Sequence, residues 1–373
     1  MKITKLETFL VKPRWLFLKI HTDEGLVGLG EPILEGRALT GAQAVAEMEP
    51  SLIGQDPTRV IHLWQSLYKH AFYRGGPILT SALSGIEHAL WDLAGKAAGV
   101  PVYKLLGGPT RDRIKVYKGI GGGTTEECIQ RAKDAVAQGF LALKTGPSGG
   151  RPARIIETPG FVQRVVERFA AIREAVGNEI DIAIDFHGAV SPQTAGLLIK
   201  ALEPYQPLFI EEPVQCQNVD VLADLARKTH IPIATGERVF TKWGFREILE
   251  KRAASILQPD ISHAGGIFEA RIIAGMAEAY YAAIAPHCPL GPISLAAGLH
   301  LDAAIPNFLA QEHTTFGAGY LKDPFVFKDG YLELPTKPGL GIELDEAAMV
   351  DKIGHEWRNP ESYHPDDGAA IDW

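Results

Sequence analysis

Ionisable residues end six successive apolar runs in the second half of the chain. They are Asp185, Glu211, Glu237, Asp260, His287 and Glu312. Neighbouring members are 23 to 27 residues apart, which is about the length of one strand–helix unit in a parallel α/β protein. One charged residue at a strand end carries little information, but six at a regular spacing predict a common site where the carboxyl ends of parallel strands meet.

The first three members of this series are carboxylates, and their convergence would be unfavourable without a positive charge. Asp185, Glu211 and Glu237 would raise one another's pKa strongly if they shared a site. A hard divalent cation removes this repulsion, and an all-oxygen ligand set without Cys or His favours Mg²⁺ over zinc. The alternative is that Glu211 or Glu237 pairs with a nearby cation such as Arg238.

Two histidines accompany the predicted metal ligands. Asp260 and His287 end neighbouring predicted strands, and a carboxylate beside an imidazole fixes the tautomer and raises the basicity that a general base needs. His187 lies two residues after Asp185 in the run IDIAIDFH. Strand alternation predicts that these two side chains point to the same face. This places His187 beside the first predicted metal ligand. We expect His187 to act as the acid of the reaction and His287 to act as its base.

Strand-like and helix-like segments alternate from about residue 114 onward. The predicted strands lie at residues 114–121, 140–146, 180–187, 207–213, 231–237, 255–260, 281–289 and 307–313. Helical spacing of apolar residues appears between them, at residues 162–177, 194–205, 220–230 and 266–280. Eight strands in this pattern favour a (β/α) barrel over an open doubly wound sheet, and a barrel has its active site at the carboxyl ends of the strands.

The N-terminal part of the chain has a different pattern. Residues 1 to about 32 predict paired strands, and residues 40–105 have apolar spacings typical of helices. We expect an α+β domain at residues 1–113 and a catalytic barrel at 114–325. Residues 326–373 lack the strand–helix rhythm and are expected to pack back on the first domain.

Composition limits the possible functions. The 373 residues are 46% hydrophobic and 22% charged with a net charge of −8, as in ordinary globular proteins, and this charge argues against nucleic-acid binding. Three cysteines without a CxxC pair predict no disulfide framework and favour the cytoplasm. No segment has the length of a signal-peptide core or a membrane span, so we expect no membrane association.

These residues and motifs resemble those of the enolase superfamily, mandelate racemase subgroup. The resemblance covers nearly the whole chain. It includes the segments GEPILEGRALT, LIGQDPTRV and FYRGGPI, and further along DFHG, LFIEEP, GER, SILQPDISHAGGI and APHCPLGPISLA. It implies a modified (β/α)7β TIM-like barrel with an N-terminal α+β capping domain.

By position, the resemblance implies that Mg²⁺ is bound by Asp185, Glu211 and Glu237. It places Glu212 outside the ligand set, and strand alternation agrees because adjacent residues face opposite ways.

The resemblance also implies the groups that act on the substrate. His287 with Asp260 is the base, His187 is the acid, and Glu312 is the acidic group that hydrogen-bonds to the developing enediolate.

The remaining site residues are expected to contact the substrate, or, in the case of Lys144, either a substrate carboxylate or a metal ligand. Lys144 is the first lysine of a K-x-K pair that racemases of this subgroup carry, but Gly146 replaces the second lysine. Without that second base, dehydration is favoured over racemisation. Trp15, Arg37 and Tyr73 lie in capping segments that are expected to close over the substrate.

The activity implied is that of a lyase in the catabolism of carbohydrate acids. A Mg²⁺-dependent hydro-lyase would remove the C2 proton and the 3-hydroxyl of an aldonate, with D-galactonate as the expected substrate and 2-dehydro-3-deoxy-D-galactonate as the product. Gluconate, arabinonate, mannonate and rhamnonate are alternative substrates, because Ala189 and residues 145–160 differ from the family pattern where sugar hydroxyls could be recognised. A racemase or cycloisomerase, or a non-catalytic metal-binding oligomer, is a weaker alternative. A small sugar acid and further copies of the chain are the expected partners.

Overall fold

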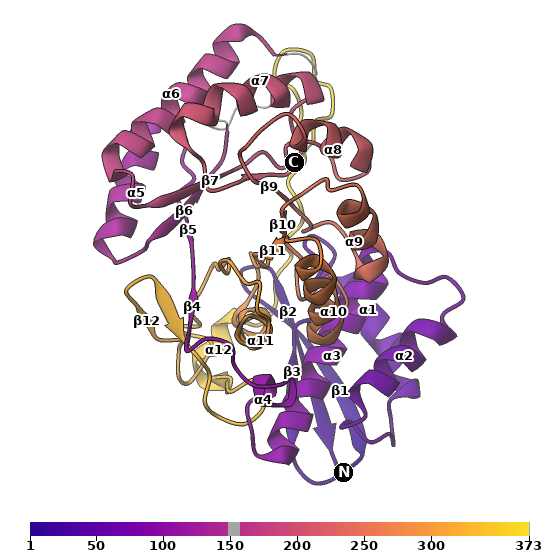
Figure 1. Cartoon of the computed structure of the whole chain (residues 1–373). Coiled ribbons are helices and arrows are strands. Elements are labelled where there is room, and N and C mark those ends of the chain that lie inside the picture. Colours follow the sequence, from indigo (N-terminus) through magenta and orange to yellow (C-terminus); the bar gives the residue numbers. More distant parts are fainter. Residues whose placement is uncertain (148–156, 373) are drawn as a thin grey trace.

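An antiparallel sheet and a group of helices form the N-terminal unit. The computed structural model describes residues 1–147 and 157–372. The sheet has the order β1 (Ile3–Val11), β2 (Trp15–Thr22), β3 (Val27–Gly30). The helices that follow it are α1 (Ala38–Met48), η1 (Glu49–Ser51), α2 (Val60–His70), α3 (Pro77–Ala98) and α4 (Val102–Leu105). Figure 1 shows this unit beside one end of the larger barrel unit.

Helix α3 is the centre of the N-terminal unit. It begins with Pro77 in its first turn and ends at Gly99, whose φ of 69° is the left-handed conformation that commonly stops a helix. Glycines let strand β3 approach α3 closely. A Cβ on Gly30 would lie only 1.9 Å from the carbonyl oxygen of Gly85, and a Cβ on Gly28 only 2.2 Å from that of Ala89.

A curved parallel sheet forms the second unit. Its strands, in spatial order, are β5 (Lys118–Gly119), β6 (Ala142–Thr145), β7 (Asp181–Asp185), β8 (Ile210–Glu211), β9 (Ile233–Thr235), β10 (Ile256–Leu257) and β11 (Ala283–Ile284). Residues 308–311 close the barrel, because Phe308 bridges Ile284 in parallel and Gln311 bridges Val116 in parallel. Residues 308–311 therefore occupy an eighth strand position, between the first and last strands of the seven-stranded sheet.

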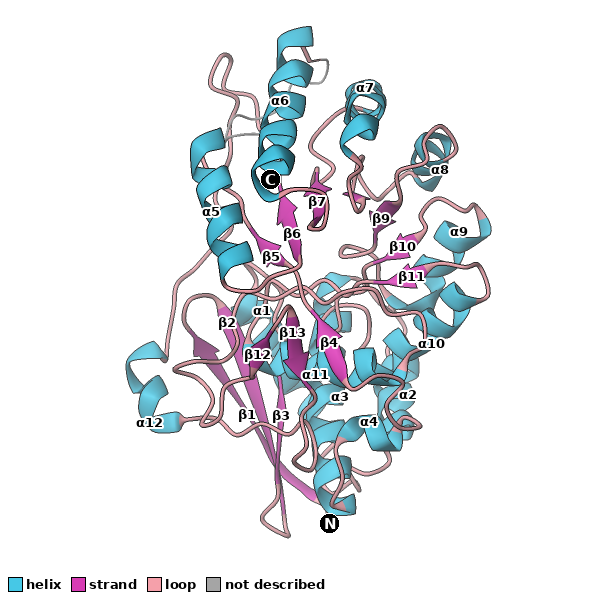
Figure 2. Cartoon of the chain, turned by 60° about the vertical axis from the view of Figure 1, so that its left-hand side comes forward, coloured by secondary structure: helices cyan, strands magenta, loops and turns pink. Residues whose placement is uncertain are grey.

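Helices cover the outside of this barrel, and Figure 2 shows α5 to α10 around the strands. They are α5 (Thr125–Ala137), α6 (Pro159–Val176), α7 (Pro192–Leu202) with η2 (Glu203–Tyr205), α8 (Val219–Ala226), α9 (Thr241–Glu250), α10 (Ile267–Glu278) and α11 (Pro292–Ala304). Across the described residues this gives the predicted (β/α)7β order. None of the helices in that part of the chain is both long and apolar enough to cross a membrane.

The C-terminal residues lie against the N-terminal unit. β12 (Phe327–Lys328) and β13 (Tyr331–Glu333) form a small antiparallel sheet with β4 (Arg113–Lys115), and α12 (Glu346–Met349) and η3 (Val350–Lys352) follow. The backbone N–H of Lys12 donates to Lys352 O at 2.8 Å, and that of Gly354 donates to Leu10 O at 2.7 Å.

Sequence patterns missed three of the barrel helices. Helix α11 is buried along nearly its whole length, so it lacks the polar stripe that marks an amphipathic helix. Helix α5 has a polar sequence, but its capping box of Thr124 and Glu127 was a usable start signal. Helix α9 buries Phe245, Ile248 and Leu249 at helical spacing within an otherwise polar segment.

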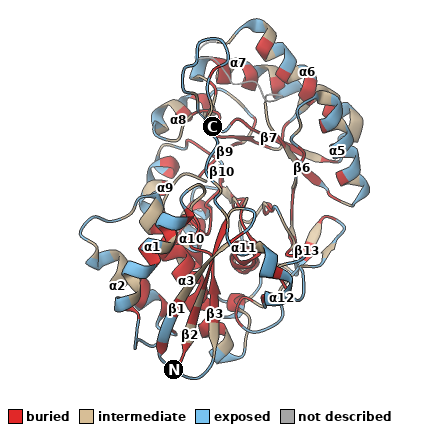
Figure 3. Ribbon diagram, turned by 180° about the vertical axis from the view of Figure 1, so that it is seen from behind, coloured by how far each residue is buried: buried red, intermediate tan, exposed pale blue. Residues whose placement is uncertain are grey.

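Small and aromatic side chains fill the barrel interior. One residue on or next to each of the eight strand positions contributes to this layer: Tyr117, Ala142, Ala183, Phe209, Ala234, Ile256, Ala285 and Ala310. Side chains packed in such a layer make the barrel a solid core rather than a pore. Figure 3 shows that buried residues follow the strands of both units.

The close approach of β3 to α3 can be tested by adding one methyl group. We expect Gly30→Ala to lower the free energy of unfolding by about 1–3 kcal/mol or more, because the new Cβ overlaps a backbone carbonyl. Gly275→Ala in α10 is the control, since its Cβ meets no atom of the described residues within 4 Å outside its own helix backbone. Chemical denaturation should show that the control is as stable as the parent or more stable, and equal stability of Gly30→Ala would contradict the packing described.

Candidate active site

The charged mouth of the barrel follows directly from its apolar interior layer. Inward-facing side chains recur every second residue along a strand. On five strand positions the residue two places beyond the layer is ionisable: Lys144, Asp185, Glu211, His287 and Glu312. The barrel therefore has an apolar floor with charged groups immediately above it, at the carboxyl ends of the strands.

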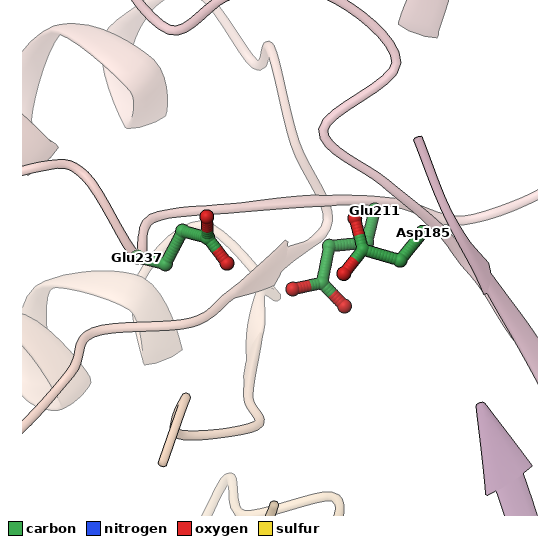
Figure 4. Close-up of side chains that lie close together, drawn as sticks. All are labelled: Asp185, Glu211 and Glu237. Atoms are coloured by element: carbon green, nitrogen blue, oxygen red, sulfur yellow. The ribbon is translucent and has the colours of Figure 1, made fainter. Parts of the chain in front are cut away.

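Three carboxylates predicted as metal ligands meet at this mouth (Figure 4). Asp185 and Glu211 are register partners on the parallel strands β7 and β8. Glu237 follows β9 after Gly236, whose φ of 143° turns the chain so that Glu237 enters the mouth. Each residue can offer one oxygen such that the oxygens all lie within 4.8 Å of one another.

The environment of these carboxylates suits a bound metal ion. Burial and the neighbouring Asp185 raise the pKa of Glu211 well above its ordinary value. Burial raises the pKa of Glu237 to about 7, with Glu212 and Asp185 adding to the effect and His287 opposing it. The buried Glu211 Oε1 has no hydrogen-bond partner among the described residues. A cation would satisfy this oxygen and relieve the repulsion among the three groups.

Lys144 supplies a positive charge next to the same carboxylates. Its Nζ lies 3.1 Å from Asp185 Oδ2, 3.0 Å from Glu211 Oε2 and 2.8 Å from Glu312 Oε1. Burial lowers the pKa of Lys144, but these carboxylates outweigh burial and hold that pKa well above its ordinary value. Lys144 therefore stays charged and contacts two of the predicted metal ligands directly.

The predicted base dyad is formed as a hydrogen-bonded pair. His287 Nδ1 lies 2.8 Å from Asp260 Oδ2 and must donate, because an ionised carboxylate can only accept. Asp260 Oδ1 accepts from the backbone N–H of Ser262 at 2.7 Å. His287 Nε2 therefore faces the mouth, 3.1 Å from Glu237 Oε2 and 3.8 Å from Glu312 Oε2.

His287 and Glu312 each shift the pKa of the other. Burial lowers the pKa of His287, but Glu237, Glu312 and Asp260 together raise it well above its ordinary value. Burial raises the pKa of Glu312, but Lys144 and His287 outweigh burial and lower it to about 2. Glu312 is thus ionised in this state and accepts from the backbone N–H of Cys288 at 3.1 Å.

His187 lies beside Asp185 for a different reason from the one that the sequence suggested. Strand β7 ends at Asp185, and His187 has a left-handed φ of 49° in the turn that follows, so strand alternation does not apply. The turn brings His187 Nε2 within 3.2 Å of Asp185 Oδ2, while the His187 backbone N–H donates to Asp185 Oδ1 at 2.9 Å. Its side chain is 52% exposed at the mouth.

Arg238, the alternative partner for the predicted ligands, is mainly engaged elsewhere. It makes a two-pronged contact with the buried carboxylate of Glu212, with Nε 3.1 Å from Oε1. Its nearest approach to Glu237 is 3.8 Å. Glu212 follows the last residue of β8 with a left-handed φ of 37°, so strand alternation does not apply to it, and its carboxylate is engaged by Arg238 rather than by the carboxylate trio.

Three residues predicted to contact the substrate lie in the N-terminal unit. Trp15 is buried in its core and packs against Phe17 and Tyr320. Arg37 is exposed at the start of α1, and Tyr73 is 83% exposed in the segment between α2 and α3. Among the described residues, no hydrogen bond, ion pair or ring contact joins these three to the carboxylates of the mouth.

Two buried carboxylates of the N-terminal unit cap helices of the barrel, a role that the sequence patterns did not predict. Glu31 accepts from the backbone N–H groups of Gly291 and Ser294, at 2.7 and 2.8 Å, where helix α11 begins. Glu87 accepts from Ile267 and Phe268 at the start of α10, both at 2.9 Å.

These helices follow the strands that carry His287 and Asp260. Each has glycine at its N-cap and no side-chain cap of its own. A carboxylate from another element can therefore accept from the N–H groups at the start of the helix. The available signal was a helix start without a capping side chain: Gly265 and Gly266 precede α10, and Gly291 precedes α11, whose first residue is Pro292.

Comparison with known proteins identifies the family. Residues 7–107 match the family described as mandelate racemase / muconate lactonizing enzyme, N-terminal domain, and residues 127–348 match the enolase C-terminal domain-like family. The chain belongs to the enolase superfamily. This confirms the resemblance and fold class predicted from the motifs.

Individual relatives in the superfamily are similar over the whole chain. It is 50% identical, over the full length of both proteins, to D-galactonate dehydratases of Ralstonia pickettii and Pectobacterium atrosepticum. A solved enolase from Agrobacterium radiobacter, with bound sodium and L-malate, superposes with a TM-score of 0.93 at 35% identity over the whole of both chains. A superfamily member from Salmonella Typhimurium gives 0.89 at 34% identity, covering 95% of this chain and 98% of that one.

Removal of the Lys144 charge should destabilise the mouth. We expect Lys144→Met to lower the free energy of unfolding by about 3–5 kcal/mol in a chelator, because it leaves buried carboxylates without their cation. Added Mg²⁺ should raise the thermal unfolding midpoint more in the variant than in the parent. Equal midpoints in the chelator would show that Lys144 does not balance these charges.

Proposed function

We propose that the protein is a Mg²⁺-dependent hydro-lyase that converts D-galactonate to 2-dehydro-3-deoxy-D-galactonate. The supporting observation is the convergence of an all-oxygen carboxylate trio with two histidines at its ends. His187 contacts Asp185 on the β7 side, and His287 contacts Glu237 on the β9 side. The full-length similarity to proteins named D-galactonate dehydratase supports the same substrate.

In this proposal Asp185, Glu211 and Glu237 hold the Mg²⁺. When bound, Mg²⁺ makes the C2 proton of a carboxylate substrate more acidic, because it stabilises the negative charge that forms when that proton leaves.

The protein side chains then move the protons. Glu237 is a proposed metal ligand and also one of the carboxylates that raise the pKa of His287, so its engagement as a ligand would favour the neutral imidazole. Neutral His287 Nε2 then accepts the C2 proton while Asp260 holds Nδ1–H in place. The cationic Lys144 stabilises the developing negative charge, and the ionised Glu312 keeps Lys144 at that position.

His187 gives a proton to the departing 3-hydroxyl, which leaves as water when the C3–O bond breaks. Its half-exposed ring can recover a proton from solvent. The enol product becomes the 2-keto acid when its 2-hydroxyl proton is lost and C3 gains a proton. The hydrogen bond expected from Glu312 to the enediolate would require a protonated carboxyl, which Lys144 and His287 oppose.

A different aldonate is the second candidate, and Ala189 is the observation that favours it. Ala189 follows Gly188 in the turn that carries His187, so a change of residue there alters the surroundings of the acid. The other divergent segment was 145–160, of which residues 148–156 lie outside the described part of the chain. Cytoplasmic location and assembly with further copies of the chain also stay predictions.

Substrate choice can be tested with a panel of aldonates and a 2-keto-acid assay. We expect D-galactonate to have the highest kcat/KM, with Mg²⁺ required. Faster turnover of gluconate, arabinonate, mannonate or rhamnonate would support the proposed reaction class but would show that D-galactonate is not the preferred substrate. Absence of a keto product from every aldonate would argue against the dehydratase itself.

The base and acid can be separated by proton exchange in deuterated water. His287→Asn should abolish exchange at C2, and general-base loss typically costs about 10²- to 10⁴-fold. His187→Asn should retain C2 exchange but lose dehydration, because it removes only the group that protonates the leaving hydroxyl. NMR of recovered substrate measures exchange, and full exchange by His287→Asn would contradict the base assignment.

The metal ligands can be tested without substrate. We expect Mg²⁺ to raise the thermal unfolding midpoint of the parent protein, and we expect Glu211→Gln to reduce this increase because the neutral amide is a poorer ligand. Glu212→Gln, which alters the neighbour that faces Arg238, should keep most of the increase. Equal responses of both variants would remove Glu211 from the ligand set.

A further inference from the structure

Arg238 joins the turns that follow three neighbouring strands. We propose that Arg238 is a positioning residue for the acid: it holds the His187 turn in place, so that its loss impairs departure of the 3-hydroxyl more than removal of the C2 proton. The inference rests on the proposed function, because it takes His187 as the acid and His287 as the base.

The guanidinium group of Arg238 connects these turns through separate N–H groups. Nε donates to Glu212 Oε1 at 3.1 Å, NH1 donates to Gln215 Oε1 at 2.9 Å, and NH2 donates to the carbonyl oxygen of His187 at 3.3 Å. NH2 also contacts Glu212 Oε2. The planar guanidinium group holds several N–H donors in fixed directions, so it can satisfy all these acceptors at once. The ammonium group of a lysine cannot match their geometry.

The backbone that Arg238 holds is in a conformation that needs support. His187 and Glu212 have φ values of 49° and 37°, in the left-handed region that non-glycine residues seldom adopt. The two turns are also joined directly, because the N–H of Gly188 donates to Glu212 O at 2.8 Å. A Cβ on Gly188 would lie 2.9 Å from Arg238 NH2, so the guanidinium lies close against this turn. Such strained residues persist only where surrounding contacts fix them.

The buried charge of Glu212 keeps Arg238 in this position. The Glu212 side chain is fully buried, whereas that of Arg238 is 37% exposed. An isolated buried carboxylate is strongly unfavourable, so the pair is expected to remain formed. Arg238 thus has a fixed location from which it contacts the His187 carbonyl.

The base is supported by different contacts. Asp260 receives the Ser262 N–H and His287 Nδ1–H, and neither contact involves Arg238. Arg238 Nε does approach Glu237 Oε1, at 3.8 Å. A test must therefore separate an effect on the acid turn from an effect on metal affinity.

Arg238→Lys is the informative substitution, because it keeps the positive charge and removes the planar guanidinium group with its fixed N–H donors. With saturating Mg²⁺, we expect the dehydration rate to fall by about 10²-fold, a typical cost of an ångström-scale misplacement of a reacting group. Exchange of the C2 proton in deuterated water should fall much less. The ratio of exchange to dehydration should therefore rise, as it should in His187→Asn.

Two further variants keep the test decisive. Glu212→Gln retains the size of the Arg238 partner and removes its charge, so it should raise the same ratio by a smaller factor. Lys242→Met breaks another ion pair with a buried carboxylate, that of Glu269 at 2.9 Å, which does not contact the His187 turn. This control should leave the ratio unchanged even if it lowers stability. The Mg²⁺-dependent increase of the thermal midpoint, measured for each variant without substrate, reports metal affinity separately.

The outcomes distinguish the inference from the proposed function. If exchange and dehydration fall by the same factor in Arg238→Lys, or the ratio rises equally in Lys242→Met, the positioning role is wrong. Loss of the Mg²⁺-dependent increase in Arg238→Lys would also overturn it, in favour of a role through Glu237. Absence of both exchange and dehydration in the parent protein would instead contradict the proposed function.

Discussion

Repulsion among carboxylates at one barrel mouth is the constraint on which the rest of the site depends. Parallel pairing puts Asp185 beside Glu211, and the turn at Gly236 adds Glu237. Their charges cannot be buried together without compensation. Lys144 supplies a cation from one side, and His287 supplies an imidazole from the other. The same imbalance that makes the trio suitable for a metal ion also fixes the orientation of the groups that would transfer protons.

The N-terminal unit contributes to this site through helix ends rather than through contact with the carboxylate trio. Glu31 and Glu87 cap helices α11 and α10, which follow the strands of the base dyad. Burial raises the pKa of Glu31 to about 8, although its backbone hydrogen bonds oppose this shift. Separation of the two units would leave both helices without their caps. The contact between the units therefore supports the chain segments that carry His287 and Asp260.

The sequence was sufficient for the barrel and its charged mouth, because both depend on short-range periodicity. Strand ends spaced by one strand–helix unit must lie at one edge, and this predicted the convergence of Asp185, Glu211 and Glu237. The position of His187 depended on a left-handed turn, which strand alternation cannot reveal. The helix caps at Glu31 and Glu87 join residues more than 175 positions apart, and local patterns carry no information on such pairs.

The floor of small side chains beneath the mouth has a consequence for the evolution of new chemistry on this barrel. Ala142, Ala183, Ala285 and Ala310 belong to the interior layer and each lies two residues before a mouth position, so a mouth residue can be exchanged while these alanines stay in place. Gly146 shows how much room the described residues leave for such an exchange, because a Cβ there would meet only one of their atoms within 4 Å, at 3.9 Å. A side chain added at that position could serve the opposite face of a substrate. Side chains for chemistry and side chains that fill the barrel interior thus occupy alternate positions of the same strands, so a substitution in one set leaves the residues of the other set in place.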